Sequence, residues 1–264
     1  MTSPDYAILD RPEILARLFH PRREWTDKPA GKGHDLDIPV APDQTIGARA
    51  HMVSVGDPTL LFFHGNGEIV ADYDELGPLF SERGLNLLVV DYRGYGRSSG
   101  RPSVSAMMAD CHRILDFCGD WLKENACSGP LIVMGRSLGS ASALELAANY
   151  PDRINGLIIE SGFAYAAPLL RLLGVDLERL GFDETAGFAN LDKIKTYSGP
   201  TLIIHAEHDH IIPYSDSEAL FKASPAAAKQ HIMIPGANHN DIFLRGADIY
   251  LDAVQQFCRA SRKT

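Results

Sequence analysis

Eight short runs rich in Val, Ile and Leu alternate along this chain with longer segments of helical periodicity, and this alternation limits the folds open to it. Continuous apolar strands separated by helices are typical of a mostly parallel sheet covered by helices on both faces. The first two runs indicate an opening strand pair. We therefore predict an α/β protein with an eight-stranded sheet. The expected strands span 34–40, 46–54, 59–64, 86–92, 131–134, 156–161, 201–206 and 231–234.

The segments between these strands read as helices of ordinary length. Gly84 is expected to end the first of them, and Ser103 has the side chain of an N-cap for the helix that follows Pro102. Residues 164–198 break the rhythm with Leu-rich, helix-like sequence, which predicts a short cap insertion over the sheet. We expect residues 1–264 to form a single domain. The expected helices span 72–84, 103–126, 138–149, 214–223 and 241–259.

Charge and cysteine content exclude several classes of function. The net charge is −9 and no Lys/Arg stripe is present, so a nucleic-acid partner is not expected. No run approaches the length of a membrane span, and the first residues lack the pattern of a secretory signal. The four cysteines have no metal-like spacing. We expect a cytoplasmic protein with reduced thiols, without a membrane partner; self-association into a homo-oligomer is left open.

Two pentapeptides fit the pattern G-x-S-x-G, around Ser98 and Ser137. Ser137 follows an apolar strand and precedes a helix of small residues, which is the sharp strand-to-helix turn that a serine nucleophile needs. Gly135 and Gly139 would let the strand and the helix approach closely. Ser98 lies in a glycine-rich loop that leaves the strand 86–92, with no helix behind it. Ser137 is therefore the candidate nucleophile.

A serine nucleophile needs a histidine to take its proton and an acid to orient that histidine. Asp209 follows the strand 201–206 and His239 lies in the loop after the last strand, so both are expected at the same sheet edge as Ser137. The backbone N–H groups of Asn66, in "HGNG", and of Leu138 are the expected oxyanion hole.

In order along the chain, "HGNG", "DYRGYGRSSG", "GRSLGS", "HAEHDHIIP" and "PGANHND" resemble the motifs of the α/β-hydrolase-fold serine hydrolases. The chain looks closest to the small ABHD-type and serine-aminopeptidase-like members, over about residues 34–260. The resemblance implies the α/β-hydrolase fold and a Ser-Asp-His triad of Ser137, Asp209 and His239, without a cofactor. It leaves the substrate open, because this fold includes esterases, thioesterases, amidases and peptidases.

Two rival functions have some support in the sequence. "HAEHDH" (205–210) is close to a zinc-binding signature, but Glu207 occupies the position of the second histidine. A non-catalytic binding protein on the same fold is the other rival, although it would not need all three triad positions. We expect a carboxylesterase-like serine hydrolase without a metal, and we keep a thioesterase or an aminopeptidase/amidase on the same triad as alternatives.

The cap insertion and the nucleophile turn each raise one more expectation. Leucines at helical spacing in 164–198 either line the pocket or only pack on the sheet, and an insertion this short favours an open pocket for small or medium acyl groups. Arg136 directly precedes the nucleophile, and Glu160 ends the neighbouring strand. We predict an ion pair between Arg136 and Glu160 beneath the turn, because an unpaired buried guanidinium would be very costly. The alternative is that Arg136 binds an acidic substrate group.

Overall fold

The fold is described by a computed structural model that covers residues 5–25 and 33–261. Its centre is an eight-stranded sheet in the order β1-β2-β4-β3-β5-β6-β7-β8, in which β2 pairs antiparallel with β1 and β4 and all other neighbours are parallel. The predicted sheet is confirmed. The strands are His34–Ala41 (β1), Gln44–His51 (β2), Thr59–Phe63 (β3), Asn86–Val90 (β4), Leu131–Arg136 (β5), Gly156–Glu160 (β6), Thr201–Ala206 (β7) and Lys229–Ile234 (β8).

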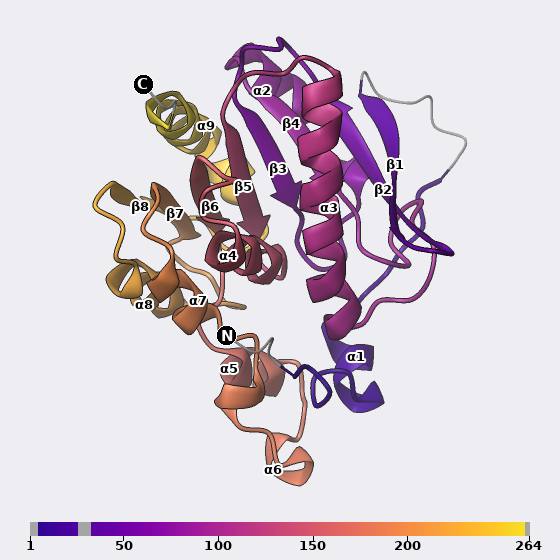
Figure 1. Cartoon of the computed structure of the whole chain (residues 1–264). Helices are drawn as coiled ribbons and strands as arrows, with labels where there is room; N and C mark the ends of the chain where they lie inside the picture. Colours follow the sequence, from indigo (N-terminus) through magenta and orange to yellow (C-terminus); the bar gives the residue numbers. More distant parts are fainter. Residues whose placement is uncertain (1–4, 26–32, 262–264) are drawn as a thin grey trace.

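Helices cover both faces of the sheet, which explains why its central strands are apolar throughout. In β3, Leu61 and Phe63 pack into the core with α3 and α4, whereas Leu60 and Phe62 pack into a second core with α2 and α9. Figure 1 shows α3 and α4 in front of the sheet. The helices outside the cap are Pro12–Leu18 (α1), Gly77–Glu82 (α2), Val104–Glu124 (α3), Gly139–Asn149 (α4), Tyr214–Ala223 (α8) and Ile242–Ala260 (α9).

The segment expected to form a cap insertion folds into short helices at the carboxyl edge of the sheet. Figure 1 shows α5 and α6 below the sheet, beside α1. The guanidinium of Arg17, in α1, donates a hydrogen bond to the backbone oxygen of Leu173 at 3.3 Å. The N-terminal helix therefore lies against the cap, a contact that the sequence did not predict. The cap elements are Ala166–Leu172 (α5), Leu177–Leu180 (α6) and Glu184–Ala186 (η2). The last helix of the predicted insertion, Asn190–Thr196 (α7), packs instead beside α4 and α8 (Figure 1).

Two predicted helix ends are confirmed and one predicted helix is wrong. Gly84 follows the C-cap of α2 with a φ of 69°. Ser103 caps α3, since its Oγ accepts a hydrogen bond from the N–H of Ala106 at 3.1 Å. The single helix expected over 72–84 is instead a 3₁₀ turn, Val70–Tyr73 (η1), followed by α2. Pro78 explains the break, because it has no N–H to continue a helix and fits only the first turn of a new one.

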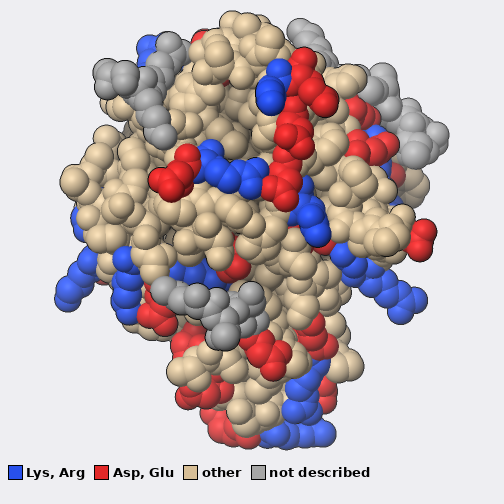
Figure 2. Space-filling view, in the orientation of Figure 1, with Lys and Arg blue, Asp and Glu red and all other residues tan. Residues whose placement is uncertain are grey.

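The surface carries charges of both signs. Figure 2 shows Lys and Arg side chains interspersed with Asp and Glu over the visible face. All four cysteines are free, and three of them are buried. Within residues 5–25 and 33–261, no helix is both long and apolar enough to cross a membrane.

Candidate active site

Ser137 lies on the turn between β5 and α4, in a backbone conformation that few non-glycine residues adopt. Its φ is 51°, in the left-handed region. The turn is tight on both sides: a Cβ on Gly135 would lie 2.3 Å from the backbone oxygen of Gly139, and a Cβ on Gly139 would lie 2.1 Å from that of Phe63. Only glycine fits these two positions, as the pentapeptide predicts, and the turn presents the Ser137 hydroxyl above the sheet edge.

The structure brings Ser137, Asp209 and His239 together from three separate loops. His239 Nε2 lies 2.9 Å from Ser137 Oγ, and His239 Nδ1 lies 2.7 Å from an oxygen of Asp209. The other oxygen of Asp209 accepts the N–H groups of Ile211 and Ile212, at 3.0 and 2.8 Å. Asp209 is thus fixed by its own loop, and its carboxylate selects the tautomer in which His239 Nε2 can accept the serine proton.

A second histidine, His205, touches the same carboxylate from the end of β7. Its Nε2 lies 2.9 Å from the backbone oxygen of Ile212 and 3.4 Å from Asp209. His205 is fully buried, whereas the His208 side chain is 69% exposed, so the histidines of "HAEHDH" point to different surroundings. Among the residues described, no three His, Cys, Asp or Glu side chains are grouped so that they could hold a metal ion.

The loop after β3 places Asn66 beside the triad and fixes its side chain. Asn66 Oδ1 accepts hydrogen bonds from the N–H of His20 at 2.9 Å and from the hydroxyl of Tyr95 at 2.7 Å. Within the described part of the chain, the backbone N–H groups of Asn66 and Leu138 have no hydrogen-bond partner. Both residues line the same cavity as Ser137 and His239. Two free donors therefore lie at the cavity that contains the serine hydroxyl.

Ser98, the serine of the second pentapeptide, lies outside this site. It is fully buried in the loop after β4, and its Oγ accepts the N–H of Gly47, in β2, at 2.9 Å. Arg23 donates to the backbone oxygen of Ser98 at 2.6 Å. The loop that carries Ser98 therefore holds β2 and the N-terminal segment together.

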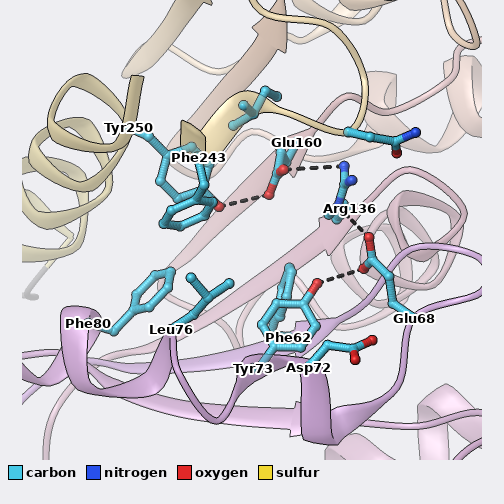
Figure 3. A pocket seen from close by; sticks show the side chains of 12 residues that line it. Phe62, Glu68, Asp72, Tyr73, Leu76, Phe80, Arg136, Glu160, Phe243 and Tyr250 are labelled. Carbon is cyan, nitrogen blue, oxygen red and sulfur yellow. Dashed lines mark hydrogen bonds and ion pairs between the residues drawn. The ribbon is translucent and has the colours of Figure 1, made fainter. Parts of the chain in front are cut away.

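Arg136 connects the parts of the site from below the nucleophile turn. The predicted contact with Glu160 is confirmed at 3.4 Å, but Glu68 is the closer partner, 2.8 Å from Arg136 Nε (Figure 3). A third nitrogen of Arg136 donates to the backbone oxygen of His239 at 3.0 Å. The pair predicted from the sequence is therefore one side of a larger cluster, and Glu68 is a member that the sequence did not reveal.

Glu68 joins this cluster to the loop that carries Asn66. One of its oxygens accepts the N–H of Gly65 at 2.8 Å and the hydroxyl of Tyr73 at 2.7 Å, while the other accepts from Arg136. Burial alone would raise the pKa of Glu68. The charge of Arg136 and these hydrogen bonds outweigh that effect and hold the pKa at about 2. Arg136 and Glu68 thus hold three loops in register: the nucleophile turn, the Asn66 loop and the His239 loop.

The cavity at Ser137 has a volume of about 280 Å³, and segments far apart in the sequence supply its apolar walls. Leu169 and Leu173 of the cap line it, and Leu18 of α1 completes the wall. Leu177 and Leu180 are buried in the fold instead. The pocket-lining interpretation therefore holds for Leu169 and Leu173, whereas Leu177 and Leu180 lie in α6, which packs against α5, and Leu172 is exposed. The part played by α1 was missed, because nothing in its sequence marks it as part of a site.

Comparisons with known proteins place the chain in a family and support the fold. Residues 56–179 match the family described as "Serine aminopeptidase, S33". The chain is 31% identical over 231 residues to "Uncharacterized protein Rv2307c" of Mycobacterium tuberculosis, covering 85% of this chain and 79% of the relative. It is 32% identical over 213 residues to the human "Alpha/beta hydrolase domain-containing protein 17B", covering 75% of this chain and 65% of that one. An esterase structure from Pyrococcus furiosus, 16% identical, superposes with a TM-score of 0.73 over 91% of this chain and 98% of that one.

Proposed function

Because this chain belongs to the α/β-hydrolase-fold serine hydrolases, we propose that it cleaves a small or medium carboxylic ester through an acyl-enzyme on Ser137. The proposal depends on one observation above all. His239 lies within hydrogen-bond distance of both Ser137 and Asp209, at 2.9 and 2.7 Å. A serine, a base and an acid in this chain of contacts form the arrangement that activates a hydroxyl for attack on a carbonyl.

The reaction proceeds in two halves. In the first, His239 takes the proton of Ser137 as its Oγ bonds to the ester carbon, and the N–H groups of Asn66 and Leu138 stabilise the oxyanion. The C–O bond to the alcohol then breaks, and His239 gives its proton to the departing oxygen. In the second half, water loses a proton to His239 and attacks the acyl group. Ser137 leaves with that proton, so the free acid is released and the enzyme is restored.

The pH dependence of this reaction follows from the burial of His239. Burial lowers its pKa below the ordinary 6.5; the hydrogen bond to Asp209 opposes this shift and the charge of Arg136 adds to it. Only neutral His239 can act as the base. We therefore expect kcat/KM to be retained at pH 6.5 and to fall through a midpoint below it. A pH–rate profile of ester hydrolysis checks this, and a midpoint above 6.5 contradicts it.

The rate of hydrolysis should depend strongly on the length of the substrate's acyl chain. A cavity of about 280 Å³, lined by Leu169 and Leu173, is small beside the roughly 300–1,000 Å³ of typical ligand pockets, which favours short acyl chains. We expect kcat/KM to be highest for acyl groups of about C2 to C6 and to fall for longer chains. A series of p-nitrophenyl esters of increasing length measures this. A preference for acyl chains of twelve carbons or more would show that the cap opens into a tunnel.

An aminopeptidase is the second candidate, because the matching family is described as a serine aminopeptidase. Such an enzyme needs a free carboxylate to hold the amino group of its substrate. Within the described residues, Glu68 is the one carboxylate that lines the cavity at Ser137, and Gly65, Tyr73 and Arg136 already engage it. This favours the ester. Matched butyryl ester, butyryl thioester and aminoacyl anilide substrates compare the three chemistries directly.

The proposed reaction needs no metal ion. We therefore expect excess EDTA to leave the rate of ester hydrolysis unchanged. The same assay with added zinc is the control. Loss of activity on chelation, with recovery on adding zinc, would replace the triad mechanism with one based on "HAEHDH".

A further inference from the structure

A second cavity of about 190 Å³ lies beside the cavity at Ser137. Figure 3 shows it between η1 and α2 on one side and the start of α9 on the other, with Arg136 and Glu68 at one end. Glu68, Arg136 and Asn240 line both cavities. The two spaces are therefore neighbours that share a polar wall, and the reaction proposed above uses only the first.

The second cavity is walled by five aromatic rings from distant parts of the chain. Phe80, Phe243 and Tyr250 form one group, with ring centroids 4.6 to 6.5 Å apart, while Phe62 and Tyr73 meet edge to face at 4.9 Å. The hydroxyls of Tyr73 and Tyr250 bond to Glu68 and Glu160, which leaves ring surface for the cavity (Figure 3). An apolar cavity of about 150 Å³ holds one benzene molecule, so this space fits a single ring.

The polar end of the cavity offers one unused hydrogen-bond donor. Arg136 Nη1 is buried and, among the residues described, has no hydrogen-bond partner; it only faces Glu160 at 3.4 Å in an ion pair. A buried donor without a partner is costly, so a ligand oxygen is favoured there once a small rotation of the Arg136 side chain turns Nη1 toward the cavity. Glu68, Glu160 and Asp72 also line the cavity. Asp72 is paired with Arg22, which leaves Glu68 and Glu160 against the guanidinium of Arg136. Two carboxyl groups against one guanidinium disfavour a negatively charged ligand.

We infer that this cavity is a binding pocket for a single neutral aromatic ring whose attached oxygen accepts a hydrogen bond from Arg136 Nη1. The aromatic side chains that line the cavity can contact the edges and the faces of such a ring on several sides. This inference rests on the function proposed above. It adds that the substrates are esters with a benzyl- or phenyl-sized group. That group can belong to the alcohol part or to the acyl part, and matched esters tell the two apart.

Binding is measured first, without turnover, on the Ser137→Ala protein. Benzyl alcohol and benzoate are titrated separately and followed by saturation-transfer NMR. We expect saturable binding of benzyl alcohol, at least about tenfold tighter than that of benzoate, since the carboxyl groups of the pocket repel the anion. Absence of benzyl alcohol binding, or tighter binding of benzoate, overturns the inference.

Variants then locate the bound ring. Leu76→Trp fills the second cavity and Phe243→Ala removes one of its rings, and each should weaken benzyl alcohol about tenfold or more. Leu244→Ala is the matched control, because Leu244 is the next residue of α9 and is 83% exposed. Leu173→Trp fills the cavity at Ser137 instead. Binding lost in Leu173→Trp but kept in both pocket variants overturns the assignment. Thermal unfolding confirms that each variant is folded.

Kinetics with the active enzyme identify the part of the substrate that carries the ring. Benzyl acetate is compared with butyl acetate, and methyl phenylacetate with methyl butyrate, in the wild type and in Leu76→Trp. We expect the kcat/KM ratio of one pair to fall about tenfold, which assigns the ring to that part. Equal ratios for both pairs in the two proteins overturn the inference. If no ester is hydrolysed while benzyl alcohol still binds, the proposed function fails and the pocket stands.

Discussion

Ser137→Ala should lower kcat for ester hydrolysis by roughly 10⁴- to 10⁶-fold and leave the fold intact. The substitution removes the atom that bonds to the acyl group, and the residual rate is what the N–H groups of Asn66 and Leu138 provide by binding alone. Alanine has a Cβ like serine, so the strain at a φ of 51° is the same for both residues. Single-turnover and steady-state assays on the purified variant measure the loss, and circular dichroism checks the fold.

Ser98→Ala is the matched control, since Ser98 has the same pentapeptide around it. Its effect should be on stability instead of activity. The substitution leaves the buried N–H of Gly47 without its acceptor, which costs about 1–3 kcal/mol in the free energy of unfolding. Urea unfolding measures that cost. Equal losses of kcat in both variants, or a loss in Ser98→Ala alone, would contradict the assignment of the nucleophile.

Arg136→Met should be the most destabilising change at the site, lowering the free energy of unfolding by about 3–5 kcal/mol at pH 7. Methionine fills much of the space, so the main cost is the buried charge left on Glu68 and Glu160. We also expect kcat to fall for all esters alike, because Arg136 holds the His239 loop through its backbone oxygen. Selective loss on anionic esters would instead favour Arg136 as a receptor for an acidic substrate group.

The pH dependence of stability separates this explanation from simple loss of packing. In the wild type, Arg136 and its neighbours hold the pKa of Glu68 at about 2, below the ordinary 4.5. That lowered pKa stabilises the fold fully above pH 4.5, and the contribution is lost as the pH falls toward 2. Without Arg136, burial raises the pKa of both Glu68 and Glu160, so the deficit of Arg136→Met should be largest at neutral pH and shrink as falling pH protonates these carboxyl groups. A deficit independent of pH contradicts the charge explanation. Arg136→Lys, which keeps the charge, should be milder.

The fold could be predicted because its signals are local. The central strands, such as β3, are apolar runs, because successive residues such as Leu60 and Leu61 enter cores on opposite faces of the sheet. The turn at Ser137 is predicted by Gly135 and Gly139, since a side chain at either position would collide with the backbone. The positions of Asp209 and His239 follow from the same topology, since residues that end parallel strands meet at one edge.

The contacts that hold the site together could not be predicted, because they join residues far apart in sequence. Nothing in the sequence distinguishes Glu68 from other loop glutamates, because only the pairing of β3 with β5 brings it to Arg136. Leu18 lies in a short helix with no motif, and only the packing of α1 against the cap makes it part of the cavity. The break at Pro78 was the exception: proline chemistry was visible in the sequence, but the apolar pattern around it suggested one continuous helix.

Covalent labelling of the wild-type protein with a fluorophosphonate probe, followed by peptide mapping, tests the proposed nucleophile most directly. The probe reacts only with a serine that a neighbouring base activates and whose oxyanion is stabilised. The predicted result is one adduct per chain, on Ser137, with no labelling in His239→Ala. An adduct on Ser98, labelling that survives His239→Ala unchanged, or an unlabelled folded protein would contradict the proposed serine hydrolase mechanism.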